Sequence, residues 1–269
     1  MAQEEEMSFL AHLEELRWHL VRSAAAIIVV ATGIFVFRKY VYEYFLLVHL
    51  KTEFVTYRLL CKTFKIIGID SDFCTITFNT ELKSLGPTDQ LMNALWASVI
   101  LGFIISFPYI IWEFWRFISP GLHEKEIKKS RGFIFSSSLL FFMGVLFSYY
   151  VILPMSVYFF YYFSVADIVV NDFTLSKYMS LITNTLLGVA IMFELPVVIY
   201  FLSKIGLITP IFLKKYRKHA LVVVLILSAI ITPPDIASQV IISIPILILY
   251  EISIVVSNRI YKKQQNAFK

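Results

Sequence analysis

Long apolar runs that contain at most one charged residue constrain this chain more than any other feature. A helix needs about 20 mostly apolar residues to cross the roughly 30 Å hydrocarbon core of a bilayer. Six runs approach this length, at residues 23–37, 90–112, 132–153, 178–203, 220–232 and 236–256. They are apolar on every face, whereas the strands of a membrane β-barrel alternate apolar and polar residues. The sequence therefore predicts an all-α membrane protein with six transmembrane helices.

Composition supports this class and excludes several others. Hydrophobic residues make up 58% of the 269 residues and charged residues 16%, against roughly 45–50% and 25% in ordinary globular domains. Such a chain is not a disordered protein, a disulfide scaffold or a nucleic-acid-binding module. The five His residues fall at predicted span ends or in loops, and the sequence has no phosphate-binding loop, nucleophile elbow or HExxH motif. We therefore expect no enzymatic activity, no metal, no cofactor and no nucleic-acid partner.

Three of the predicted spans depart from a simple helix of ordinary length. The third run stays uncharged to Ala166, too long for one span at ~1.5 Å per residue. We expect Pro154 to end its membrane part, with the aromatic segment 158–163 on the surface. The run 220–232 covers only about 20 Å as a helix, and Pro245 interrupts the last run. Spans five and six are therefore predicted to be short.

Charge distribution predicts the orientation and the domain boundaries. An even number of spans places both termini on one side, and most Lys and Arg residues fall on that side. Because short cytoplasmic loops carry the excess of cations, both termini are predicted to be cytoplasmic. Residues 1–22, with apolar residues at helical spacing, form an expected amphipathic cytoplasmic segment. The transmembrane domain is predicted at 23–258, with an outer loop at about 40–89, and a basic cytoplasmic tail at 259–269.

The outer loop contains both cysteines, Cys61 and Cys74. Disulfides form on the outer side of the membrane, but the spacing does not show whether the two Cα atoms approach closely enough. A bridge and two free thiols both remain open.

Glu194 is the charged residue placed deepest in a predicted span. It lies about two-thirds of the way along the fourth span, before Pro196, which leaves one backbone carbonyl without its helical partner. A carboxylate at this depth costs ~2.5 kcal/mol or more, so it needs a polar partner, a cavity or a proton. A protonated Glu bonded to a neighbouring helix would satisfy this need; we favour a functional contact.

Other acidic residues have simpler interpretations. Asp235 follows Thr-Pro-Pro and is predicted to cap the last span. Glu251 can reach the interface or pair with Arg259. Three carboxylates in or beside the loop after the second span are solvated charges by default: Glu113, Glu124 and Glu126. The neighbouring Phe117, Ile118 and Pro120 add an apolar surface, which suits a ligand that is cationic at one end and apolar at the other.

Five short motifs, taken in order, resemble a known family. They are His12-Leu13-Glu14-Glu15-Leu16-Arg17; Phe107-Pro108 followed by Trp115 to Leu122; Ser136 to Phe141 followed by Pro154; Phe193-Glu194-Leu195-Pro196; and Thr232-Pro233-Pro234-Asp235 with Ser238-Gln239. Each is weak alone, but together across six spans they make the sequence similar to the TatC family, the core subunit of the twin-arginine protein translocase.

The resemblance implies a receptor, in the cytoplasmic (inner) membrane, for signal peptides that carry paired arginines. The family's recognition site corresponds here to Glu15, Arg17, Phe117 and Glu126, with Glu124 competing with Glu126 as the main carboxylate. The intramembrane Glu194 is implied to contact small single-span subunits of the TatA/TatB type. Pro120, Pro196 and Asp235 match family positions with expected structural roles.

The resemblance also implies partners and an energy source. We expect contact with membrane lipid, a homo-oligomer within a receptor complex and transport of folded precursors driven by the proton-motive force. The outer loop is longer than is usual for the family and carries the cysteine pair. The alternative function is a proton-coupled secondary transporter that uses Glu194 as its carrier; the internal repeats typical of such transporters are not evident.

Overall fold

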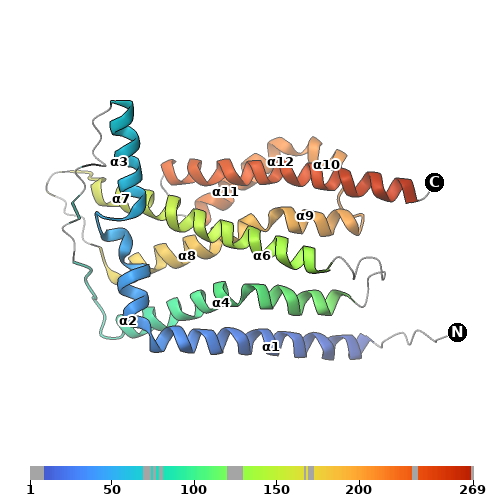
Figure 1. Ribbon diagram of the computed structural model, residues 1–269, viewed down its shortest axis with the longest axis horizontal. Helices are drawn as coiled ribbons and strands as arrows, with labels where there is room; N and C mark the ends of the chain where they lie inside the picture. Colours follow the sequence, from blue (N-terminus) through green and yellow to red (C-terminus); the bar gives the residue numbers. More distant parts are fainter. Residues whose placement is uncertain are drawn as a thin grey trace. The chain divides into compact units, whose positions relative to one another are not determined.

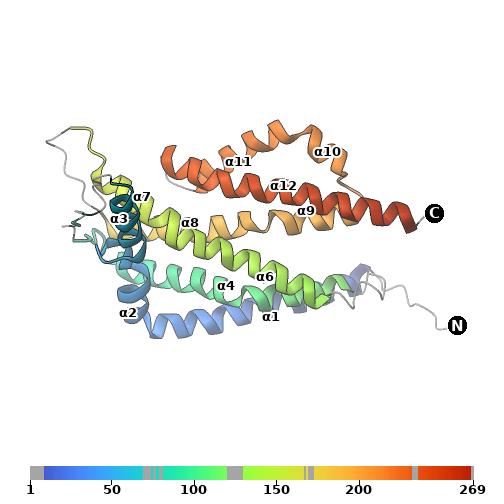
Figure 2. The same cartoon turned by 45° about the horizontal axis from the view of Figure 1, so that its top comes forward.

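The computed structural model describes residues 9–68, 74, 77–78, 81–119, 130–166, 168, 173–231 and 236–267. Regular structure in these ranges is helical, and their one β-bridge joins Lys83 to Thr174. The chain divides into two compact units: residues 1–38 with 94–139, and residues 39–93 with 140–269. Figures 1 and 2 show the helices from two directions.

The first unit is built on two long helices. α1 is Phe9–Val36, and α4 is Asp89–Ile118, whose residues from Ala94 onward belong to this unit. The two approach closely at Gly102, where an added Cβ would lie 3.0 Å from the Ala31 Cβ and from the Ile27 carbonyl oxygen. Glycine therefore permits a contact that a larger side chain would push apart.

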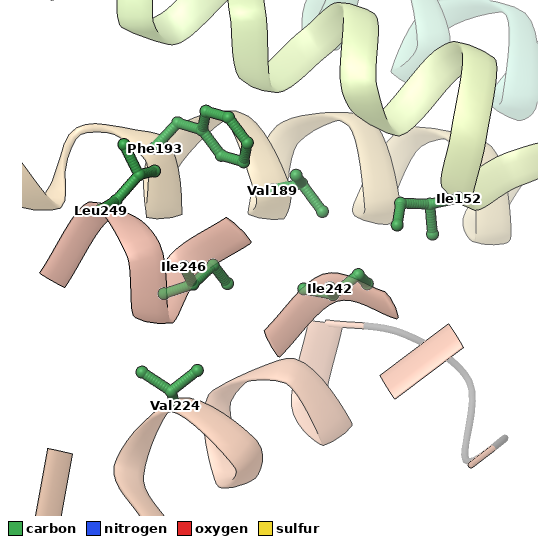
Figure 3. Packing of buried hydrophobic residues seen from close by; sticks show 7 residues of the cluster. All are labelled: Ile152, Val189, Phe193, Val224, Ile242, Ile246 and Leu249. Carbon is green, nitrogen blue, oxygen red and sulfur yellow. The ribbon is translucent and has the colours of Figure 1, made fainter. Parts of the chain in front are cut away.

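The second unit contains the helical segments from residue 140 onward. They are α6 (Ser130–Phe147, from Leu140 onward), the π-helical turn η5 (Ser148–Ile152), α7 (Leu153–Tyr162), α8 (Leu175–Phe193), α9 (Leu195–Lys204), α10 (Pro210–Lys215), α11 (Arg217–Ile231) and α12 (Ile236–Ala267). Its core is a cluster of aliphatic and aromatic side chains from η5, α8, α11 and α12, drawn in Figure 3: Ile152, Val189, Phe193, Val224, Ile242, Ile246 and Leu249. Because lipid tails are as apolar as these side chains, close van der Waals packing stabilises the cluster rather than transfer out of water.

Five of the helical segments in the described ranges are long and apolar enough to cross a membrane. They are Leu13–Val36, Asp89–Ile118, Gly132–Tyr162, Leu175–Lys204 and Gln239–Lys263. The fifth predicted span, 220–232, corresponds to α11, which has 15 residues and is short as predicted. α12, with 32 residues, continues well beyond the predicted end near residue 256 and includes most of the predicted tail.

The structure differs from a simple reading of the sequence at two points. The described part of the predicted N-terminal segment, from Phe9 onward, continues into the first span as one helix, α1. Pro154 does not end the third span, contrary to the prediction; it lies inside the helical segment Gly132–Tyr162, at the start of α7. The π-helical turn η5 before it makes room for the proline ring. The helix therefore continues, and the aromatic segment 158–162 is helical.

A cap formed by residues 42–67 packs on the end of η5 and α7. It consists of η1 (Tyr42–Leu46), η2 (Val48–Leu50) and α3 (Val55–Ile67). The Tyr57 hydroxyl donates to the carbonyl oxygens of His49 and Pro154 at 3.1 and 3.0 Å. A disulfide joins Cys61 to Cys74, with 5.0 Å between the Cα atoms, so the bridged alternative is the one observed.

His49 is the buried centre of this 42–67 cap. Its side chain is fully buried and packs against the rings of Phe54, in a tilted contact, and Tyr149, edge-on, each with its centroid 4.6 Å away. Its Nε2 donates to the Tyr149 carbonyl oxygen at 3.0 Å. Burial lowers the pKa of His49 to about 4, although the Tyr149 carbonyl favours the protonated ring. The imidazole is therefore neutral at physiological pH.

Acid is expected to loosen the 42–67 cap through His49. Between pH 6.5 and 4 the unfolded histidine binds a proton that the folded one does not, so stability falls as pH falls through this window. The two pKa values correspond to a loss of about 3 kcal/mol. Hydrogen exchange of the cap amides, corrected for intrinsic rates, measures the change. His49→Gln keeps a donor but does not titrate, so it should remove most of the pH dependence; His219→Gln, at an exposed histidine, should not. Equal acid loosening in all three proteins would contradict the assignment.

Candidate functional site: a carboxylate cluster in α1 and α4, and a helix break at Glu194

The residues predicted to recognise a signal peptide fall partly within the described chain. Glu15 and Arg17 lie in α1, and Phe117 lies in the last turn of α4. Glu126, its competitor Glu124, and Pro120 lie outside the described residues. The described members of the predicted site lie in α1 and α4, in parts of these helices that belong to the same unit.

Glu113 is the centre of this part of the unit, and it is not the solvated charge that the sequence suggested. It is 1% exposed. The His19 Nδ1 lies 2.5 Å from its Oε2, and the Tyr109 hydroxyl donates to its Oε1 at 3.0 Å. The guanidinium groups of Arg22 and Arg116 approach the same carboxylate at 3.9 and 3.7 Å. Glu113 thus connects α1 to α4 through a cluster of five polar residues.

The Glu113 cluster is energetically demanding. A buried ion costs several kcal/mol in desolvation, which only close partners can offset. Here His19 is buried as well, at 9% side-chain exposure, whereas Arg22 and Arg116 are about half exposed. Arg116 also lies over the Trp112 ring at 5.0 Å from its centroid, which favours the cation further. The carboxylate is therefore already neutralised and is not free to bind another cation.

Phe117 and Glu15 both lie close to His19. The Phe117 ring packs edge-on against the His19 ring, with centroids 6.2 Å apart. Glu15 precedes His19 by one helical turn and so shares its face of α1. The Glu15 Oε2 is buried and has no hydrogen-bond partner among the described residues. The Phe117 ring therefore contacts His19, and a buried acceptor without a donor lies one helical turn before that histidine in α1, while Arg17 is exposed.

Sequence reasoning missed His19 and misjudged Glu113. The two are 94 residues apart, and a lone histidine at the start of a span has no local pattern that reveals a partner. One signal was present: Tyr109, Glu113 and Arg116 occur at helical spacing, which places three polar side chains on one face of an apolar helix.

Glu194 interrupts the fourth span. α8 ends at Phe193 and α9 begins at Leu195 with Pro196 in its first turn. The Glu194 N–H donates to the Ile191 carbonyl at 3.0 Å, while its own carbonyl accepts from the N–H of Val197 and Val198. The side chain is half-buried, next to Phe193 of the core cluster shown in Figure 3. The interruption is confined to this one residue, immediately before Leu195 and Pro196.

Two further acidic residues, Glu251 and Asp235, had predicted structural roles. Glu251 pairs with Arg217 of α11 at 2.6 Å, not with Arg259 of its own helix. Asp235, the predicted helix cap, lies outside the described residues.

Known proteins similar to this chain belong to one family of membrane proteins. Residues 11–245 match the family model described as Sec-independent protein translocase protein (TatC). The Sec-independent protein translocase protein TatC of Blattabacterium sp. subsp. Periplaneta americana (strain BPLAN) is 42% identical, over 96% of this chain and 98% of the relative. The TatC protein of Aquifex aeolicus (strain VF5) is 32% identical, over 98% of this chain and 100% of its own length.

Solved structures give the same result. A crystal structure of the twin-arginine translocase receptor TatC matches with a TM-score of 0.68 at 33% identity, covering 91% of this chain and 97% of that one. A second, of the same receptor in DDM, matches with a TM-score of 0.71 at 33% identity, covering 92% and 99%. The predicted all-α, six-helix membrane class is confirmed, and the transporter alternative is not retained. The chain belongs to the TatC family of Sec-independent protein translocase subunits, multi-pass proteins of the inner membrane that are not enzymes.

Proposed function

We propose that this subunit binds paired-arginine signal peptides at the cytoplasmic ends of α1 and α4. Glu126 is the principal carboxylate, and Glu15 is the second. The observation that supports the proposal is a buried Glu15 Oε2 without a hydrogen-bond partner, one helical turn before His19, whose ring contacts Phe117. A guanidinium forms bidentate, charge-assisted hydrogen bonds with a carboxylate, while Phe117 contacts the apolar part of the signal.

The Glu113 cluster serves this site as its support. Its carboxylate is surrounded by groups of the chain itself, so it does not receive the peptide. It holds the His19 ring, and through that ring it positions Phe117 and the adjoining turn that carries Glu15. Arg17, exposed on another face of α1, completes the set of residues carried over from the family's opening signature.

Glu194 is proposed to recruit single-span TatA/TatB-type subunits. The break between α8 and α9 puts a carboxyl group and irregular backbone within a span, where hydrogen bonds to a polar residue of a neighbouring helix are favoured over exposure to lipid. Assembly of several copies with such partners then exports folded precursors, driven by the proton-motive force.

Photocrosslinking tests the recognition site directly. Benzoylphenylalanine replaces Phe117 in the full chain, reconstituted with a labelled peptide that carries paired arginines. The crosslink is expected at this position and is expected to disappear when the two arginines are replaced by lysines, because lysine lacks the bidentate fork. The matched control is the same replacement at Phe37, an exposed aromatic just beyond the opposite end of α1. Equal yields at both positions, or with both peptides, would contradict the proposal.

A further inference from the structure

The helix α3 of the 42–67 cap has three different faces. Tyr57 is fully buried against the rest of the cap. Val55, Leu59 and Ile66 recur at helical spacing and are 53%, 63% and 85% exposed. Arg58, Lys62 and Lys65 form a third, exposed stripe along one edge of the apolar one. A water-facing helix would carry polar residues where α3 carries Leu59 and Ile66.

The fixed contacts of α3 lie towards its beginning. Tyr57 donates to two backbone carbonyls, and the Thr56 hydroxyl donates to the Tyr150 carbonyl at 2.6 Å. The disulfide at Cys61 fastens the middle of the helix. Beyond it, Ile66 and Ile67 are 85% and 63% exposed. The apolar stripe is thus carried partly by a projecting, anchored half-helix.

Its direction suits a bilayer surface. In Figures 1 and 2, α3 runs across the long helices of its own unit, at one end of them, whereas α8 and α12 run along the unit. A helix that lies across the ends of spanning helices lies in the plane of the membrane interface. There, apolar side chains enter the acyl boundary while basic side chains reach the phosphates.

We propose that α3 binds anionic phospholipid at the membrane surface, with Val55, Leu59 and Ile66 inserted and Arg58, Lys62 and Lys65 on the headgroup phosphates. The charges favour this occupant: α3 contains three cations and no acidic residue, and within the described part of the chain these cations form no salt bridge. The 42–67 cap is thereby held against the bilayer on the side of the long loop, independently of the signal-peptide site.

Depth measurements test this binding. The full chain carries a nitroxide on Ile66→Cys, its native cysteines being joined to each other, in nanodiscs of pure phosphatidylcholine or with 30% phosphatidylglycerol. The nitroxide should collide often with oxygen, which dissolves in lipid, and rarely with a water-soluble nickel complex. Phosphatidylglycerol should increase the fraction of chains whose label is inserted in the bilayer. Each cation near an anionic surface contributes about a fivefold preference. Arg58→Gln/Lys62→Gln/Lys65→Gln should therefore shift the ratio of inserted to exposed label by on the order of 100-fold.

A matched triple variant controls for net charge. Lys214→Gln/Lys215→Gln/Lys218→Gln removes three exposed cations near α10 and α11 and should leave the label at residue 66 unchanged. Binding of a paired-arginine peptide should be the same in both triple variants, which shows that the chain is folded. The proposal is overturned if nickel reaches the label freely in both lipid mixtures. It is also overturned if the label stays protected in the α3 triple variant, since contact would then not depend on phosphate recognition.

Discussion

Glu126→Gln is expected to weaken binding of a paired-arginine signal peptide by about 30-fold or more. Removing the charge from one partner of a desolvated, hydrogen-bonded pair costs about 2 kcal/mol or more, which corresponds to this factor. The neutral amide keeps the size of the side chain but replaces one acceptor oxygen with a donor that opposes the guanidinium. Fluorescence anisotropy of a labelled peptide with the reconstituted chain measures the affinity.

Two further substitutions make this result specific. Glu124→Gln changes a neighbouring carboxylate by the same chemistry and should have little effect; the reverse result would move the principal role to Glu124. Glu194→Gln should retain peptide affinity and instead lower the amount of a single-span partner subunit that copurifies. If neither loop variant changes peptide affinity, the recognition site lies elsewhere.

Glu113→Ala should produce the largest loss of stability. It leaves His19 buried without its partner and Arg22 and Arg116 without their shared carboxylate, and breaking a buried pair in this way costs about 3–5 kcal/mol. All four tryptophans, Trp18, Trp96, Trp112 and Trp115, belong to the unit that contains this cluster. Tryptophan fluorescence during denaturation therefore reports its unfolding directly.

A paired substitution separates support of the site from stability alone. His19→Gln/Glu113→Gln keeps a neutral hydrogen bond between α1 and α4 and should recover much of the lost stability. It replaces the ring against which Phe117 packs, so peptide affinity should remain low. If affinity returns together with stability, the cluster only stabilises the unit and does not position the site.

Much of the helical architecture follows from the apolar runs, because the need to cross a bilayer dominates every local preference. Local signals are less informative at residues 22–23 and at Pro154, which was predicted to end a span. Arg22 and Ser23 are polar but compatible with a helix, so α1 continues through them. Pro154 disturbs only the turn before it, and the wider π-helical turn Ser148–Ile152 supplies the room. Neither outcome can be read from propensity, since both depend on packing against other helices.

A site residue could be predicted from the sequence only where its depth in a span makes a charge there energetically unfavourable. Glu194 stood out because a charge at that depth requires an explanation. Glu113 did not, since near a span end it could equally have been solvated. Its burial depends on His19, Tyr109 and Arg22, which only the folded unit brings together. In the same way, Glu251 of α12 pairs with Arg217 of α11. The two residues are far apart in the sequence, so this contact could not be predicted from it.

Whether Cys61 and Cys74 are oxidised depends on the side of the membrane on which their loop lies. Thiols are kept reduced in the cytoplasm and are oxidised outside it, so the bridge can close only after the loop has crossed the membrane. A copy whose loop stayed behind would keep two reactive thiols, and a thiol reagent that cannot cross the membrane would not reach them from outside. An oxidised Cys61–Cys74 pair therefore shows that this loop has been inserted in the correct orientation.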